Sequence, residues 1–250
     1  MGTRALIVGG SRGIGLAFVR ALLCDPGFEC VTAAARAPAE SAGLQDLRQV
    51  HGERLTLLTL DVTDEASIEQ AAAATREVHP SLQLLVNTAG VLHDVEGLAP
   101  ERRLAEVKLE NLMRSYAVNA VGPLLLAKHF HSLLAHRERA VLANLSARVG
   151  SIGDNRLGGW YAYRAAKAAQ NQITRTMAIE LARHAPNLIC VALHPGTVAT
   201  DLSAPFRGNV TAEKLFTPDR AAEQLLGVIA GLTQEASGHF YAWDGAEIPW

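Results

Sequence analysis

The stretch "LIVGGSRGIG" (residues 6–15) decides the fold, because an apolar run passes directly into a cluster of glycines. The run predicts a buried strand, and the residues after it have helical spacing. Gly9, Gly13 and Gly15 fall at this strand-to-helix turn. Small residues there let the backbone approach a pyrophosphate, and the free N–H groups of the helix start attract it. The spacing is G-x-x-x-G-x-G, and its place in the first strand–helix unit favours dinucleotide binding over a turn without a ligand.

Short apolar runs alternate with longer helical patterns along the rest of the chain. The runs are nearly continuous in apolar residues, as strands buried on both faces of a parallel sheet should be. The predicted strands are "ALIVGG", "FECVTAAA", "RLTLLTLD", "LQLLVNTAG", "AVLANLSA", "NLICVALHPG" and "GHFYAW". The predicted helices are Gly15–Leu23, Glu65–Val78, Leu109–Leu134 and Trp160–Arg183, and the long loops Ala37–Gly43, Leu92–Glu101 and Asp201–Pro218. The alternation predicts one α/β domain over residues 1–250, with a Rossmann-like, doubly wound, seven-stranded parallel sheet covered by helices on both faces.

Composition limits the function classes. The formal net charge of −2 gives no reason to expect a nucleic acid or an anionic membrane as partner. Cys24, Cys30 and Cys190 contain no C-x-x-C pair, so neither a disulfide frame nor a metal site is expected. The apolar run after Arg4 is too short for a signal peptide, and the uncharged stretches are too short to span a membrane. These features predict a cytosolic protein.

The end of the second predicted strand bears on the choice between NAD and NADP. It reads "TAAARAP" (32–38) and has no carboxylate, which would bind a ribose 2′-hydroxyl and repel a 2′-phosphate. Arg36 lies at this end, and Arg12 lies inside the glycine loop. A guanidinium can bind phosphate oxygens bidentately, although either arginine alone would also fit a solvated surface. Together the two arginines favour NADP(H).

The stretch "GGWYAYRAAKAAQ" (158–170) places a tyrosine and a lysine on one helical face. Tyr163 and Lys167 are four residues apart, whereas Tyr161 has Ala165 at that spacing. A phenol titrates near pH 10 and is a poor acid at neutral pH unless an ammonium stabilises its anion. Alone, the pair would also fit a buried tyrosine beside a snorkelling lysine. Behind a phosphate loop it indicates an acid–base pair, with Tyr161 as a packing or pocket-wall residue.

Several motifs occur together in one order: "GGSRGIG", "LDVTD", "NTAG", "YAVNAVGP", "YAYRAAK" and "HPGTVATDL". With these motifs the chain resembles the short-chain dehydrogenase/reductase family over essentially its whole length. "NLSARVGSIGDNRLGGWYAYRAAKAA" and "YAWDGAEIPW" are most similar to its C-factor-like and sniffer-like carbonyl reductase branch. The resemblance implies NADPH-dependent reduction of a small aldehyde or ketone by a homodimer or homotetramer. The alternative is an NAD(P)-binding signalling or regulatory protein of C-factor type with little turnover.

The resemblance also implies roles for individual residues. Tyr163 would be the general acid, Lys167 would lower its pKa and bind the nicotinamide ribose, and Asn119 would hold a proton-relay water. On sequence alone, Asn119 fits a helix kink or cap equally well. The implied cofactor contacts, besides Tyr163 and Lys167, are Gly9, Ser11, Arg12, Gly13, Ile14, Gly15, Arg36, Asp61, Val62, Asn87, Ala89, Gly90, Pro195, Gly196, Val198 and Thr200.

One position departs from the family pattern. The family serine that bonds the substrate oxygen lies three residues before a glycine, and counting back from Gly150 gives Ala147. Ser146 is one residue earlier, and a shift of one residue on a strand points the side chain to the other face. A bulge could bring Ser146 to the site, Ser151 in the next loop could supply the hydroxyl, or the hydroxyl could be absent. We favour Ser146 as the catalytic serine, with Ser151 as the alternative.

Two segments are expected to shape the substrate pocket, "VLHDVEGLAPERR" and a substrate loop over about 201–217. Their apolar side chains, with few polar groups, suit a modest aldehyde or ketone, unless they only pack on the body of the domain. The candidate apolar wall residues are Phe206, Leu202, Leu215, Leu98, Trp160 and Ile152, and the polar ones are Arg207, Asp154 and Asn155.

Overall fold

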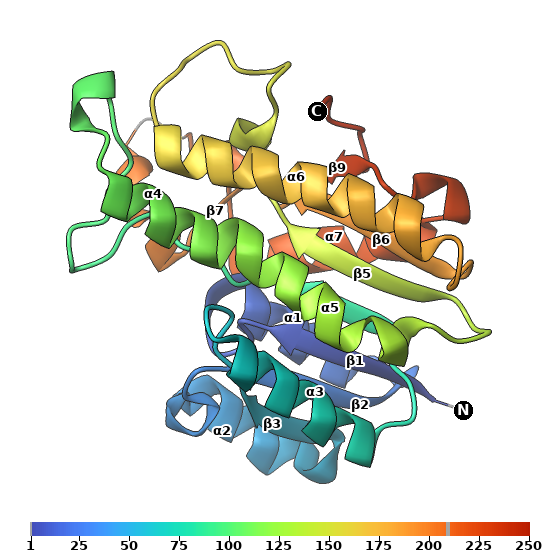
Figure 1. Ribbon diagram of the computed structural model, residues 1–250. Helices are drawn as coiled ribbons and strands as arrows, with labels where there is room; N and C mark the ends of the chain where they lie inside the picture. The colour runs from blue at the N-terminus through green and yellow to red at the C-terminus, as the bar shows by residue number, and fades with distance from the viewer. Residues whose placement is uncertain (1, 209–210) are drawn as a thin grey trace.

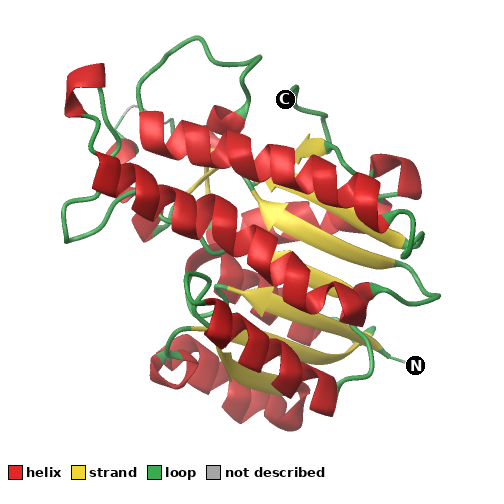
Figure 2. Cartoon of the chain, viewed as in Figure 1, coloured by secondary structure: helices red, strands yellow, loops and turns green. Residues whose placement is uncertain are grey.

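The computed structural model describes residues 2–208 and 211–250. Its main sheet has seven strands, all parallel, in the order β3-β2-β1-β4-β5-β6-β9 (Figures 1 and 2). The strands are β1 (Thr3–Val8), β2 (Phe28–Ala35), β3 (Leu55–Thr59), β4 (Leu84–Asn87), β5 (Ala140–Leu145), β6 (Leu188–His194) and β9 (Phe240–Ala242). Six of the predicted apolar runs contain one of them in full and the first overlaps β1, which begins at Thr3, so the predicted sheet is confirmed. The strand order reverses between β1 and β4, and such a switch point is where open α/β sheets bind ligands.

Helices cover both faces of the sheet. In Figure 1, α3, α5 and α6 lie in front of the strands, and α1 and α7 lie behind them. Phe18 of α1 and Leu225 of α7 are buried in one apolar cluster, and Phe130 of α5 and Met177 of α6 are buried in the other. The helices are α1 (Gly13–Cys24), α2 (Ala42–His51), α3 (Glu65–Val78), α4 (Leu109–Tyr116), α5 (Gly122–Leu134), α6 (Tyr161–Leu181) and α7 (Pro218–Gly231). Burial on both faces explains why the strands are apolar along their whole length.

The structure corrects the first predicted loop. The loop predicted at Ala37–Gly43 ends early, because α2 already begins at Ala42. The cap of α2 is Ser41, whose hydroxyl accepts from Leu44 N and donates to Ser11 O in the glycine loop. A tertiary contact to the glycine loop therefore helps to fix the start of this helix.

The structure also corrects the last predicted loop, Asp201–Pro218. It contains a 3₁₀ turn over Asp201–Phe206, and β8 (Leu215–Phe216), which pairs in parallel with β7 (Thr197–Val198). Pro218 is the first residue of α7. The loop predicted at Leu92–Glu101 holds no helix or strand. Within the described ranges, no helix combines the length and the apolar character needed to cross a membrane.

Candidate active site

The turn after β1 is shaped for an anion. Gly9 and Gly13 have φ values of 82° and 53°, in the left-handed region that glycine adopts readily. A methyl group at Gly15 would lie 2.1 Å from Gly9 O, so a larger residue would not fit there. Helix α1 starts at Gly13 without a side-chain cap and without an acidic residue in its first turn. Its first N–H groups therefore remain free for a phosphate.

A cavity of about 610 Å³ opens at the switch point, above the carboxyl ends of the strands. It is lined by most of the residues predicted from the sequence: Gly9, Ser11, Arg12, Gly13, Ile14, Gly15, Arg36, Asp61, Val62, Ala89, Gly90, Ser146, Tyr163, Lys167, Pro195 and Thr200. Other lining residues are Asp94 and Glu96, which belong to the segment expected to shape the substrate pocket, and Arg114, which was not predicted. Arg114 forms ion pairs with both acids, and their separation in the sequence gave no signal for this cluster.

Four predicted site residues do not line the cavity but surround it. Asn87 is buried, donates to Asn144 Oδ1 at 3.2 Å and accepts from Ala89 N at 3.1 Å, so it fixes the turn after β4. Gly196 has a φ of 78°, and a methyl group there would lie 2.7 Å from the Phe216 ring. Val198 is buried in β7. These three residues shape the backbone around the cavity; the fourth, Asn119, is described below.

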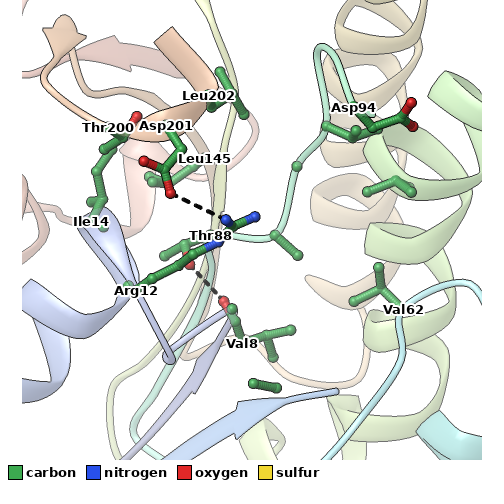
Figure 3. A pocket seen from close by; sticks show the side chains of 18 of the residues that line it. Val8, Arg12, Ile14, Val62, Thr88, Asp94, Leu145, Thr200, Asp201 and Leu202 are labelled. Atoms are coloured by element: carbon green, nitrogen blue, oxygen red, sulfur yellow. Dashed lines mark hydrogen bonds and ion pairs between the residues drawn. The ribbon is translucent and has the colours of Figure 1, made fainter. Parts of the chain in front are cut away.

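Arg12 connects the two sides of the cavity. In Figure 3 its guanidinium faces Asp201, and its Nη1 lies 3.2 Å from Asp201 Oδ2. The two side chains are 74% and 83% exposed, and a pair so open to solvent contributes at most about 1 kcal/mol. Arg12 is thus held weakly and stays accessible. Arg36 follows β2 directly and lines the same cavity.

Tyr163 and Lys167 lie on α6 and face the cavity, although they are only 8% and 2% exposed. Lys167 Nζ lies 5.8 Å from the centre of the Tyr163 ring. It donates to Leu145 O at 2.7 Å and to Gln170 Oε1 at 2.8 Å. Burial raises the pKa of Tyr163 and lowers the pKa of Lys167 to about 7. Burial is the cause of both pKa shifts in this arrangement.

Neither candidate serine presents a free hydroxyl in this arrangement. Ser146 Oγ donates to Asn171 Oδ1 at 2.7 Å, although Ser146 lines the cavity. The register of β5 against β6 is regular through Leu145, so the bulge considered for Ser146 is not found there. Ser151 Oγ donates to Pro249 O in the C-terminal segment and accepts from Asp154 N. Ser151 does not line the cavity, so of the two serines only Ser146 borders it.

Asn119 lies in a π-helical turn, Ala117–Val121, between α4 and α5, where a single continuous helix was predicted. Such turns often occur at functional sites. Asn119 is buried; its Nδ2 donates to Val91 O at 2.8 Å and to Ser115 O at 3.0 Å. Its Oδ1 accepts from Val91 N at 3.1 Å. The side chain thus ties the π turn to the loop after β4, close to Gly90.

The family model for short chain dehydrogenases matches residues 3–210. The chain belongs to the short-chain dehydrogenase family. An oxidoreductase of Schizosaccharomyces pombe is 31% identical over 97% of this chain and 96% of its own length. The C-signal of Myxococcus xanthus is 35% identical over 72% of this chain and 99% of its own length.

Solved structures of carbonyl reductases superimpose closely on this short-chain dehydrogenase. An NADPH-bound carbonyl reductase from chicken fatty liver has a TM-score of 0.87 and 32% identity, and the match covers 100% of both chains. The carbonyl reductase Sniffer of Drosophila melanogaster has a TM-score of 0.87, 27% identity and the same coverage. The resemblance to the C-factor-like and sniffer-like branch is confirmed, and the protein is an oxidoreductase by family.

Aromatic side chains gather beside Tyr163 in this short-chain dehydrogenase. The Trp160 ring is edge-on to the Tyr163 ring with centroids 6.3 Å apart, and lies 5.0 Å from the Phe206 ring. His93 makes an edge contact with Phe206 at 5.9 Å. These four rings come from three segments, so we call Trp160, Phe206 and His93 the aromatic wall of Tyr163.

The other predicted pocket residues are distributed differently. Leu98 and Leu202 border the cavity, whereas Ile152 and Tyr161 are exposed away from it. Leu215 belongs to β8. The predicted polar residues are engaged elsewhere: Asp154 pairs with Arg148, Arg207 donates to Ser203 Oγ, and Asn155 Oδ1 accepts from Gly158 N. Residues 209 and 210 of the predicted substrate loop lie outside the described residues.

Proposed function

We propose that this protein is an NADPH-dependent carbonyl reductase that reduces a small aldehyde or ketone to an alcohol, with Tyr163 as general acid. The observation that carries the proposal is that Tyr163 and Lys167 face the same cavity as the glycine loop. The closeness to an NADPH-bound carbonyl reductase supports it further. We also propose a cytosolic homodimer or homotetramer, which light scattering coupled to size-exclusion chromatography would test.

The cavity suits NADP(H) on its own chemistry. The uncapped start of α1 favours the pyrophosphate, because an acidic cap there would repel it. Arg12 and Arg36 are the cations available for a 2′-phosphate, and "ARAP" after β2 contains no competing acid. Asp61, whose Oδ1 accepts from Thr63 N at 2.8 Å, is fixed at the rim for the adenine. Lys167 would hold the nicotinamide ribose.

The proposed chemistry assigns the proton to the protein. When bound, the reduced nicotinamide supplies a hydride to the carbonyl carbon. Tyr163 donates its phenolic proton to the carbonyl oxygen as negative charge develops there, and its raised pKa keeps it protonated at neutral pH. Lys167 stabilises the phenolate that results, and a water chain along Asn119 would return the proton. Tyr163 would be the main donor to the substrate oxygen, because Ala147 has no hydroxyl and Ser146 already donates to Asn171.

The aromatic wall beside Tyr163 supports a small, weakly polar substrate; of its three residues His93 lines the cavity, whereas Trp160 and Phe206 are not among the lining residues. Trp160 and Phe206 lie close to Tyr163 and carry no charge. Apolar rings around a few placed polar groups favour apolar ligands and fix their orientation. A modest aldehyde, ketone or diketone meets these requirements better than a polyanion does.

The test is the oxidation of NADPH with a panel of aldehydes, diketones and quinones. Tyr163→Phe should lower kcat/KM by about 10²- to 10⁴-fold, the range for loss of a positioned acid. The matched control is Tyr161→Phe on the same helix, which should keep native turnover because Tyr161 points away from the cavity. Equal activity in the native protein and Tyr163→Phe would contradict the proposed mechanism.

The alternative is an NAD(P)-binding signalling or regulatory protein with little turnover. Ala147 at the serine position and the similarity to C-signal favour this candidate. It predicts tight NADPH binding with no turnover above that of Tyr163→Phe. Ala147→Ser separates the two candidates further: a reductase that lacks one donor should gain turnover from the new hydroxyl, whereas a sensor should remain inactive.

A further inference from the structure

Gln170 lies one helical turn after Lys167 on α6 and is 1% exposed. Its Oε1 accepts from Lys167 Nζ at 2.8 Å, and its Nε2 donates to Leu145 O at 3.3 Å. Leu145 O also accepts from Lys167 Nζ at 2.7 Å. Ammonium, amide and carbonyl thus form a closed triangle at the carboxyl end of β5. A buried amide in this position costs free energy unless it is paired, and here both of its polar atoms are paired.

The triangle limits what Lys167 can do. An ammonium has three N–H donors, and Leu145 O and Gln170 Oε1 take two of them. The third is left for the cavity, which Lys167 lines together with Tyr163. A methyl group at Gly90 would lie 4.0 Å from Lys167 Nζ and 3.2 Å from Asn119 Oδ1, so the ammonium lies close to the loop after β4. Gln170 Oε1 therefore takes one of the three donors, and together with Leu145 O it leaves one for the cavity.

The groups around Lys167 make the Gln170 Oε1 acceptor important for the charge state of the Lys167 ammonium. On α6, the titratable neighbour is Tyr163, whose ring lies 5.8 Å from Nζ. The loop after β4 and the π turn bring Gly90 and Asn119, which are neutral, and the segment after β5 brings Gly150 against the lysine Cβ. Burial is the cause of the lowered Lys167 pKa, with no charged partner raising it among the described residues. Neutral acceptors such as Leu145 O and Gln170 Oε1 then favour the charged form.

We propose that Gln170 is a positioning residue for Lys167, which holds the ammonium through one acceptor and leaves a single N–H donor for Tyr163 and the cofactor ribose. This inference deepens the proposed function and rests on the role of Lys167 in it. Gln170 itself does not line the cavity, so it acts through Lys167 and not on the substrate.

The chain allows a direct test, because its lysines are Lys108, Lys128, Lys167 and Lys214. With lysine labelled by ¹³C at Cε, an NMR titration follows each of these side chains, and Lys167→Met assigns the buried one. Gln170→Leu removes the acceptor and should lower the midpoint of the Lys167 titration by about one pH unit, the size expected for one hydrogen bond to a charged group. Gln170→Glu adds a carboxylate and should raise the midpoint. Gln172→Leu, at an exposed position on the same helix, should leave it unchanged.

The same variants give a second readout in the pH profile of kcat/KM with NADPH, which should move in the direction of the NMR midpoint for each variant. If Gln170→Glu does not fold, Gln170→Asn replaces it: its shorter side chain should not reach Nζ, so its midpoint should fall as in Gln170→Leu. Unchanged midpoints in Gln170→Leu and Gln170→Glu, or shifts of both in one direction, would overturn the proposal. If the Lys167 midpoint falls in Gln170→Leu and rises in Gln170→Glu while the native protein shows no turnover, Gln170 is supported as a positioning residue and the reductase is rejected.

Discussion

The backbone N–H of Trp160 donates to the main-chain oxygen of Glu101 at 2.5 Å, which fastens the first residue before α6 to the loop after β4. Glu101 makes a second contact, because its Oε2 accepts from Ala162 N at 3.2 Å. The N-cap position of α6, Trp160, has no side-chain cap of its own. Glu101 therefore supplies from a distance what a capping serine or aspartate supplies locally, and a negative charge at that helix end is favourable.

Replacing Glu101 by alanine should destabilise the protein. Loss of a helix cap costs about 0.5–2 kcal/mol, which at this chain length lowers the melting temperature by about 2–4 °C for each kcal/mol. Differential scanning calorimetry measures the change. Glu223→Ala is a suitable control, because Glu223 is an exposed acid in the middle of α7, away from both helix ends. Equal melting temperatures for Glu101→Ala and the native protein would show that the distant cap contributes nothing.

Trp160 combines an unusual backbone with a place in the aromatic wall. Its φ of 54° makes it, within the described residues, the one residue besides glycine in the left-handed region. Trp160→Gly should relax the backbone while removing the ring, so the KM for apolar carbonyl substrates should rise with little loss of stability. Trp160→Ala removes the same ring but keeps the backbone cost, so its melting temperature should fall below that of Trp160→Gly. Steady-state kinetics and thermal unfolding of the two variants distinguish the effect of losing the ring from the effect of the left-handed backbone.

Arg36 and Arg12 should differ in their effect on cofactor choice. Arg36→Ala should weaken NADPH binding by about tenfold or more, as expected for the loss of a charge-assisted hydrogen bond, and leave NADH binding unchanged. Arg12→Ala should have a smaller effect, since Arg12 is already paired with Asp201. Fluorescence titration with both nucleotides gives the dissociation constants. A parallel loss for NADPH and NADH in Arg36→Ala would argue against a 2′-phosphate contact.

Buried Lys167 should make stability depend on pH. Its pKa falls from 10.5 to about 7 on burial, so between these values the unfolded chain binds more protons than the native protein. The free energy of unfolding should therefore rise with pH above 7. Above pH 9 the buried Cys190 thiol acts in the opposite sense, because burial raises its pKa from 9.0 to about 12. The test window is thus pH 7 to 9, where urea unfolding of Lys167→Met should show a flatter pH dependence than the native protein.

The sequence was sufficient for the sheet and for most of the cavity. The apolar strands were predicted because burial on both faces of the sheet requires apolar residues along the whole strand. Helix α3 was predicted over its full extent, and the structure has Asp64 as its N-cap and Glu65 in its first turn. The glycine loop, Tyr163 and Lys167 followed from fixed spacings on single elements.

What could not be predicted depends on contacts between distant segments. Helix α2 is capped by Ser41, which also contacts the glycine loop, and the cap of α6 comes from Glu101, about sixty residues earlier. The partners of Ser146 and Ser151, Asn171 and Pro249, follow from tertiary packing and not from spacing along β5. Gln170 left one local signal, a polar residue three positions after a lysine on the buried face of the helix, which could have indicated a partner for that lysine.

The short ladder between β7 and β8 has a consequence for how such enzymes diversify. Thr197 pairs with Leu215 and Val198 with Phe216 in parallel, so the segment between the two strands is anchored at both of its ends by this one short ladder. Its anchor is independent of the main sheet, in which neither strand takes part. Insertions, deletions or a whole replacement from a relative can therefore be accommodated there without a change in the register of the core. Changes in this segment, which contains Phe206 of the aromatic wall, can alter the surroundings of Tyr163 while α6, which carries Tyr163 and Lys167, stays unchanged.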